Sequence, residues 1–236
     1  MGYLQLRFYV WKSCQFKLCG LSGKAKHNSL SIITARHKTY SLEPFSRFPI
    51  PEKNSLPDDV KKTFQEVEEK AGFVPNVFKA LSYRPDELKA FMQYHDVVME
   101  ERGNLTKADK EMIVVATSAE NNCLYCIVAH GAILRIYSKD PYLADQLSAN
   151  WRTADITERQ RAILEFAMDV CHCRPLKEET FDKLYKHGFT ADDAWDIGSV
   201  ASLFALSNRM AFLTNLKPNQ EFYLMGRVKR DKKDGK

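Results

Sequence analysis

Apolar residues recur every three or four positions along most of the chain between residues 58 and 213, which is the spacing of one helical face. A representative stripe consists of Val60, Phe64, Val67 and Ala71. Proline, glycine and helix-capping residues divide the pattern into separate elements. The expected helices cover residues 58–71, 77–81, 85–99, 106–119, 123–138, 141–150, 157–173, 178–187 and 190–213. No period-two alternation is present, so the sequence predicts an all-α fold.

A weak internal repeat relates two of these helices. Residues 105–113 resemble residues 156–164, which lie 51 positions later. Glu111 of the first copy corresponds to Ala162 of the second, and a cysteine–histidine motif follows only the first copy. We therefore expect a helical bundle in which the repeat is structural and the chemistry belongs to one half.

The chain has 236 residues and a formal net charge of +5, but this charge is unevenly distributed. Residues 1–42 contain seven Lys or Arg and no Asp or Glu, which leaves 28 basic and 30 acidic residues in the remainder. The near-neutral remainder predicts no nucleic-acid partner. No apolar run approaches the ~20 residues of a transmembrane helix, so we expect no membrane insertion. The predicted units are a leader at 1–42, a helical domain at 44–226 and a charged, disordered tail at 227–236.

The leader is basic, free of acidic residues and rich in serine, which is typical of a mitochondrial transit peptide. A secretory signal is disfavoured because Arg7 and Lys12 interrupt its apolar residues. The sequence therefore predicts a mitochondrial location. The alternative is a disordered extension on a cytoplasmic protein.

The candidate reactive residues are Cys123, Cys126 and His130, in the pattern C-x-x-C-x-x-x-H. At ~100° per residue, these three side chains fall within about 60° of one helical face, with His130 about one turn beyond Cys126. The two thiols are also close enough in sequence to form a disulfide. The spacing predicts a redox-active dithiol beside an imidazole that can hold or relay a proton.

A thiol attacks a peroxide as its thiolate, so its pKa must fall below the free value of ~8.5. Asn121 and Asn122 favour a helix N-terminus at this point. Both cysteines would then lie in the first turns, where the helix dipole stabilises an anion. We predict that Cys126, with His130 beside it, attacks the peroxide, and that Cys123 then condenses with the resulting sulfenic acid to give a disulfide.

Two other interpretations of the cysteines stay open at this point. Cys123, Cys126 and His130 could supply three ligands to zinc, although a structural zinc site needs four and no second C-x-x-C is present. The thiols could also be inert core side chains, which would leave His130 unexplained. Cys171 and Cys173 would point about 200° apart on a helix, and we expect them to be packing residues. We expect neither a metal nor a cofactor.

Residues 118–130, with the sequence SAENNCLYCIVAH, resemble the signature of the alkylhydroperoxidase D/carboxymuconolactone decarboxylase superfamily. The chain is most similar to the branch called peroxidase-related enzymes. The resemblance extends from about residue 44 to residue 226 and includes supporting blocks at 72–78, 208–211 and 221–222. It implies an AhpD-like helical bundle.

In that superfamily an acidic residue twelve positions before the first cysteine forms a proton relay with the histidine, and Glu111 occupies this position. The relay also involves a histidine between the cysteines, where this chain has Tyr125. The resemblance thus adds Glu111 and Tyr125 to the site, and we include Glu120 as a reserve acid. Glu111 can face His130 only if the chain folds back at residues 121–122, because one unbroken helix would separate it from the thiols by about 22 Å.

These observations predict a thiol-dependent hydroperoxidase, an antioxidant enzyme of the peroxiredoxin type whose substrate is a hydroperoxide. The resemblance implies regeneration by an external dithiol, either thioredoxin-like or lipoyl, and assembly as a homo-oligomer, either a trimer or a hexamer. The apolar sequence of residues 195–213 also favours assembly. The alternatives are a non-catalytic, stress-linked interaction protein with the same fold and a zinc-binding protein. A lyase is disfavoured, because that chemistry has no use for two neighbouring thiols.

Overall fold

Threonine caps fix the start of three helices. Thr106, Thr157 and Thr190 each accept a hydrogen bond from the backbone N–H three residues later, and the side chain of that later residue bonds back to the backbone N–H of the threonine. The helix start that the sequence predicts at Thr157 is therefore confirmed. At the opposite end of a helix, Gly72 adopts a left-handed conformation that stops α1 (Asp58–Ala71).

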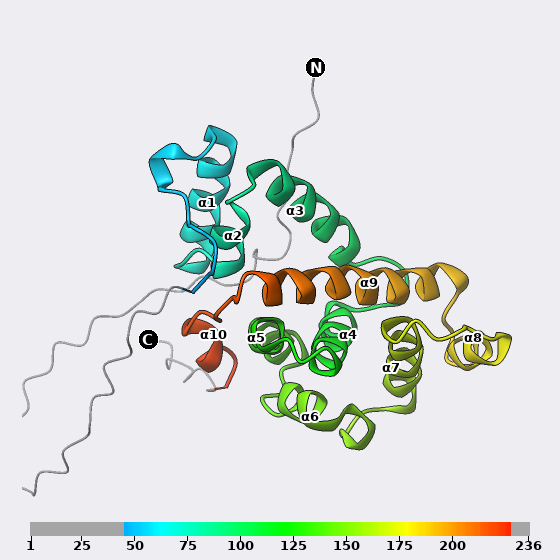
Figure 1. Cartoon of the computed structure of the whole chain (residues 1–236). Helices are drawn as coiled ribbons and strands as arrows, with labels where there is room; N and C mark the ends of the chain where they lie inside the picture. Colours follow the sequence, from blue (N-terminus) through cyan, green and yellow to red (C-terminus); the bar gives the residue numbers. More distant parts are fainter. Residues whose placement is uncertain (1–44, 228–236) are drawn as a thin grey trace, which may run out of the picture.

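The computed structural model describes residues 45–227, and this part of the chain is all-α, as the sequence predicts (Figure 1). Its elements are η2 (Lys53–Ser55), α1 (Asp58–Ala71), α2 (Asn76–Leu81), α3 (Pro85–Met99), α4 (Lys107–Glu120), α5 (Leu124–Ser138), α6 (Leu143–Asn150), η3 (Trp151–Thr153), α7 (Glu158–Cys171), α8 (Glu178–Tyr185), α9 (Ala191–Leu213) and α10 (Glu221–Leu224). The predicted leader and all but the first residue of the predicted tail lie outside the described residues. Within residues 45–227, no helix has both the length and the hydropathy needed to cross a membrane.

The long helix α9 runs across the middle of the fold, with α1–α3 on one side and α4–α7 on the other (Figure 1). It packs against α3, α4, α5, α7 and α8. Because apolar residues occupy most of its circumference, α9 can be covered from both sides. It is therefore the element that joins the two layers of the fold.

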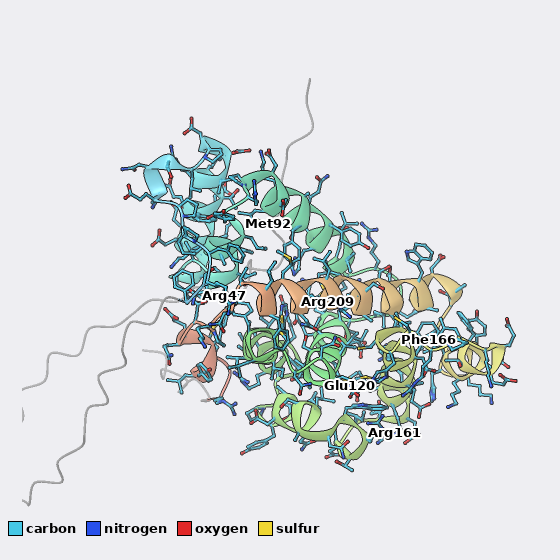
Figure 2. The ribbon with its side chains drawn as sticks, viewed as in Figure 1. Arg47, Met92, Glu120, Arg161, Phe166 and Arg209 are labelled. Carbon is cyan, nitrogen blue, oxygen red and sulfur yellow. The ribbon has the colours of Figure 1, made fainter. Side chains whose placement is uncertain are left out.

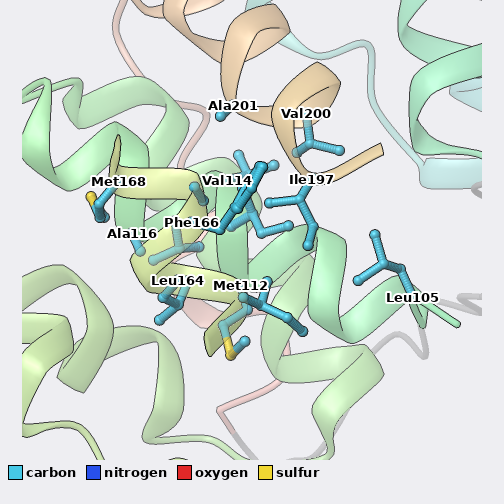
Figure 3. Close-up of a cluster of buried hydrophobic side chains, with 14 of the residues drawn as sticks. Leu105, Met112, Val114, Ala116, Leu164, Phe166, Met168, Ile197, Val200 and Ala201 are labelled. Atoms are coloured by element: carbon cyan, nitrogen blue, oxygen red, sulfur yellow. The ribbon is translucent and has the colours of Figure 1, made fainter. Parts of the chain in front are cut away.

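The largest apolar core lies between α4, α6, α7 and α9 (Figure 3). In α4 the consecutive residues 112–116 are all buried, because neighbouring helices cover the helix on every side. Each buried Val, Leu or Ile stabilises the fold by about 1.5–3 kcal/mol relative to leaving it exposed. α4 is thus a rigid platform for the residues that follow it.

A second apolar cluster surrounds the two cysteines of the C-x-x-C motif. Its buried members are Ala80, Cys123, Tyr125, Cys126, Ala129, Ala132, Ala211, Leu216 and Phe222. They come from α2, α5, the turn before α5, and the chain from the end of α9 to α10. The dithiol therefore lies inside the fold, between elements that are distant in sequence.

Three local predictions were wrong. The helix expected from Pro141 begins at Leu143, because the Asp140 carboxylate accepts hydrogen bonds from the backbone N–H groups of the next turn. Arg227, which we assigned to the tail, pairs with Asp145 at 2.7 Å and belongs to the folded part. Cys173 is exposed and follows the end of α7, so it is not a packing residue.

Candidate active site

The chain folds back between α4 and α5 through a tight turn at residues 121–123. Asn122 adopts a left-handed conformation with φ of 54°, which asparagine tolerates better than most residues. The backbone N–H of Cys123 donates to the carbonyl of Ser118 at 2.9 Å and closes the turn. The fold-back predicted at this position is therefore confirmed, and α5 packs along α4.

The turn places both cysteines at the start of α5. Cys123 is the N-cap residue itself, and Cys126 is the third residue of the helix. The two side chains are free thiols that are 2% and 1% exposed, respectively. The Sγ of Cys126 lies 3.8 Å from the Oγ of Ser207 on α9. The dithiol is thus shielded from bulk water and bordered by polar groups of α9.

The two thiols ionise in a defined order. The pKa of Cys123 is lowered to about 7, first by a hydrogen bond from the Cys126 thiol and then by the backbone N–H of Cys126, the Asn208 side chain and the backbone N–H of Tyr125. The pKa of Cys126 is raised by its interaction with Cys123 and by burial. Because Cys123 is the N-cap residue of α5, its sulfur lies at the positive end of the helix dipole, which favours the thiolate on Cys123.

His130 on α5 and Glu111 on α4 form a partly buried pair. The Nδ1 of His130 lies 2.7 Å from Oε2 of Glu111, and the two side chains are 13% and 5% exposed. The ring of His130 also packs edge-on against Phe204 at a centroid distance of 4.6 Å. When Nδ1–H donates to the carboxylate, Nε2 is left as the nitrogen that can take or give a proton. The structure therefore brings Glu111 to the histidine, as the sequence predicts.

Two other predicted site residues have different partners. Glu120, which is labelled in Figure 2, lies at the C-terminal end of α4. It accepts a hydrogen bond from Nε2 of His172 at 2.8 Å. The buried hydroxyl of Tyr125 accepts a hydrogen bond from the backbone N–H of Val77 at 3.2 Å, and burial raises the pKa of this phenol. Glu120 and Tyr125 thus make contacts between helices, and the buried acid of the site is Glu111.

Sequence reasoning missed Ser207 and Asn208, which reach the dithiol from α9. Ser207 contacts Cys126, and the carboxamide of Asn208 lies close enough to both sulfurs to lower their pKa by hydrogen bonding. The only signal in the sequence was the block at 208–211, which supported the resemblance without a role for any residue.

A small cavity of about 10 Å³ lies between α2, α3, α9 and the chain that follows α9, and neither cysteine lines it. Its walls are mostly apolar, and Ser207 is one of its few polar residues. Ser207 also contacts Cys126, so this side chain links the cavity to the dithiol. A volume of this size holds about one water molecule.

The described residues contain no group of three Cys, His, Asp or Glu side chains arranged to hold a metal ion. Cys123, Cys126 and His130 therefore do not form the three-ligand zinc site that the sequence left open. The donors around the dithiol instead point to thiol ionisation and proton transfer.

Comparisons with known proteins agree with the signature in residues 118–130. The carboxymuconolactone decarboxylase family matches residues 85–169. A crystal structure of an alkylhydroperoxidase AhpD core, an uncharacterized peroxidase-related protein from Ralstonia eutropha, is 57% identical with a TM-score of 0.77 and covers 79% of this chain and 98% of its own. An uncharacterized peroxidase-related protein from a Silicibacter species is 36% identical, with a TM-score of 0.75, and covers 80% of this chain and 100% of its own.

A more distant structure, the debrominase Bmp8, is 18% identical with a TM-score of 0.60 and covers 77% of this chain and 95% of its own. At that identity it shares the fold alone. A comparison with curated proteins found no match.

Proposed function

The chain belongs to the carboxymuconolactone decarboxylase/AhpD family, which includes enzymes, and we propose that it is a thiol-dependent peroxidase. The observation that carries the proposal is the dithiol at the N-terminus of α5 together with the buried His130–Glu111 pair. A thiolate stabilised by helix amides supplies a nucleophile, and the imidazole supplies a proton donor and acceptor. The names of two similar proteins, which are called peroxidase-related, agree with a function of this class.

The reaction would proceed through a sulfenic acid. The Cys126 thiolate attacks one peroxide oxygen, so that an S–O bond forms, the O–O bond breaks and the alcohol or water leaves with a proton from His130. Cys123, which has taken the proton of Cys126, then attacks the sulfenic sulfur. The S–S bond forms, the S–O bond breaks, and this proton joins the departing hydroxide to give water. An external dithiol, thioredoxin-like or lipoyl, reduces this disulfide and is itself oxidised to a disulfide.

Cys126 keeps the attacking role in this proposal although Cys123 ionises first. Ser207, a wall residue of the cavity, contacts Cys126, and His130 follows Cys126 by one helical turn. The Cys126 thiol donates to the Cys123 thiolate, so this proton can pass to Cys123 as Cys126 attacks. The thiolate with the higher pKa is also the stronger nucleophile once it forms.

The surface of α9 supports the further proposal that the protein is a homo-oligomer. Trp195, Leu206, Phe212 and Leu213 on this helix are all exposed, although they are large and apolar. A second copy of the chain would remove these side chains from water. Light scattering of the purified protein would measure the assembly.

The proposed function is tested by hydroperoxide consumption with thioredoxin and dihydrolipoamide as alternative donors. Cys126→Ser should abolish turnover, whereas Cys173→Ser, which removes an exposed thiol, should leave the rate unchanged. Cys123→Ser should accumulate a sulfenic acid on Cys126 that a dimedone-type probe captures. Turnover by Cys126→Ser would exclude Cys126 as the nucleophile. A wild-type protein inactive with both donors would instead favour the non-catalytic interaction protein.

A further inference from the structure

Asn208 is a buried carboxamide on α9 that hydrogen-bonds to α4 and to the turn before the dithiol. Only 1% of the residue is exposed. Its Oδ1 accepts a hydrogen bond from Nδ2 of Asn121 at 3.0 Å, and its Nδ2 donates to Oγ of Ser118 at 3.0 Å. Asn121 belongs to the turn between α4 and α5, and Ser118 lies one helical turn earlier on α4. The carboxamide is therefore fixed at two points before it meets the sulfurs.

These two contacts fix which way the carboxamide faces. The Nδ2 of Asn121 can only donate, so the atom of Asn208 that it meets must be the carbonyl oxygen. A carboxamide has two N–H bonds, and Ser118 uses one of them. One N–H is left. Asn121, which bonds to Asn208, lies two residues before Cys123, and Ser207, the neighbour of Asn208 in α9, contacts Cys126, so the carboxamide lies beside the dithiol. Hydrogen bonding to Asn208 also acts to lower the pKa of both thiols.

We propose that Asn208 is a catalytic hydrogen-bond donor of the dithiol site, whose remaining N–H stabilises a thiolate on either Cys123 or Cys126. A donor between two sulfurs does not commit the negative charge to one of them. The same N–H can donate a hydrogen bond to the resting thiolate of Cys123 and then to the attacking thiolate of Cys126, while the backbone keeps its conformation. Ser207 cannot replace it, because its hydroxyl contacts Cys126 alone.

The inference deepens the proposed peroxidase function and rests on it for the attacking step, but the donor role can be measured without peroxide. The readout is the ultraviolet absorbance of the thiolate as a function of pH in the reduced protein. The four other cysteines, Cys14, Cys19, Cys171 and Cys173, are replaced by serine in every variant. A protein without peroxidase turnover could still pass this test, so the two proposals fail separately.

Asn208→Ala should raise the first thiol pKa from its value of about 7 by about one to two units, because a hydrogen bond to a charged group is lost. The matched control is Asn219→Ala. Asn219 is also a buried carboxamide, but it accepts a hydrogen bond from the backbone N–H of Asn76 and donates to the carbonyl of Val74. The control should lose stability and keep the thiol pKa of the parent.

Asn208→Asp serves as a second variant of equal size, because Asn121 and the Ser118 hydroxyl can both donate to its carboxylate. It removes both N–H bonds and adds a negative charge, so its thiol pKa should rise above that of Asn208→Ala. If either Asn208 variant folds and its first thiol pKa lies within about 0.3 unit of the parent's, the proposal is overturned. An equal rise in Asn219→Ala would overturn it too, because the effect would then be a general loss of packing.

Discussion

The turns that end α4 and α7 have the same backbone geometry but carry different chemistry. Asn122 and Cys173 both adopt left-handed conformations, with φ of 54° and 52°. In each turn the next backbone N–H, of Cys123 or of Arg174, donates to the carbonyl five residues earlier, at 2.9 and 2.8 Å. This is the hydrogen-bond pattern of a Schellman helix end. The internal repeat therefore extends through the turn as well as the helix.

The two copies diverge directly after the turn. In the first copy α5 starts directly after the turn, so Cys123 is the N-cap residue of this helix. Backbone N–H groups of the first helical turn act to lower its pKa. In the second copy, residues 174–177 separate the turn from α8. Ala162 stands where the first copy has Glu111, so the second copy also lacks the buried acid. The turn is therefore a structural device, and the immediate helix start and Glu111 supply the reactivity.

Glu111→Ala replaces the glutamate of the first copy with the alanine found in the second copy, and it should strongly lower the activity. His130 loses its buried carboxylate partner, so the second-order rate constant for hydroperoxide reduction should fall about 100-fold. Stopped-flow measurements of peroxide consumption give this rate. Glu120→Ala is the matched control, because Glu120 pairs with His172 instead. Equal losses in the two variants would contradict the role assigned to Glu111.

The helix start at Cys123 should make the stability of the reduced protein depend on pH. The pKa of Cys123 is about 7 in the folded chain, against 9.0 for an ordinary thiol. The folded chain therefore binds fewer protons between these values. Its stability rises with pH across this window and is lost as the pH falls through about 7.

Urea unfolding at pH 7 and pH 9 measures this dependence. The free energy of unfolding of the wild-type protein, measured relative to that of Cys123→Ser, should rise by on the order of 2 kcal/mol from pH 7 to pH 9. If the free energies of unfolding of the two proteins differ by the same amount at both pH values, the pKa of Cys123 is not lowered in the folded protein.

The shared turn geometry predicts a smaller effect at Cys173. Glycine adopts positive φ without the steric cost of a Cβ, so Cys173→Gly should stabilise the protein by about 1 kcal/mol. Asn122→Gly should stabilise the protein less than Cys173→Gly does, because asparagine already tolerates this conformation. Urea unfolding measures both. Cys173→Ala controls for loss of the thiol, and an equal gain in this variant would rule out backbone strain as the cause.

The sequence predicted the fold well because the signals involved are local. The Thr157 box, the Gly72 helix end and the apolar stripes depend on residues within a few positions of one another. The contact between Glu111 and His130 was also predictable, because the family spacing and the turn at residues 121–122 determine it together.

The rest of the site depends on packing between distant segments. Asn208 reaches the dithiol only because α9 crosses α4 and α5, and no local pattern carries that information. For the same reason, the sequence did not show that Glu120 meets His172 or that Tyr125 meets Val77. The order of thiol ionisation followed from the N-cap position of Cys123, which required the helix boundary to the residue.

The contrast between the two turns can be tested by one decisive measurement on the unmodified chain. Reduced protein is mixed with one equivalent of an organic hydroperoxide, quenched at short times with an alkylating reagent and analysed by peptide mass spectrometry. A Cys123–Cys126 disulfide should form first, although both thiols are buried and Cys173 is exposed. Oxidation of Cys173 while Cys123 and Cys126 are still recovered as alkylated thiols would contradict the account.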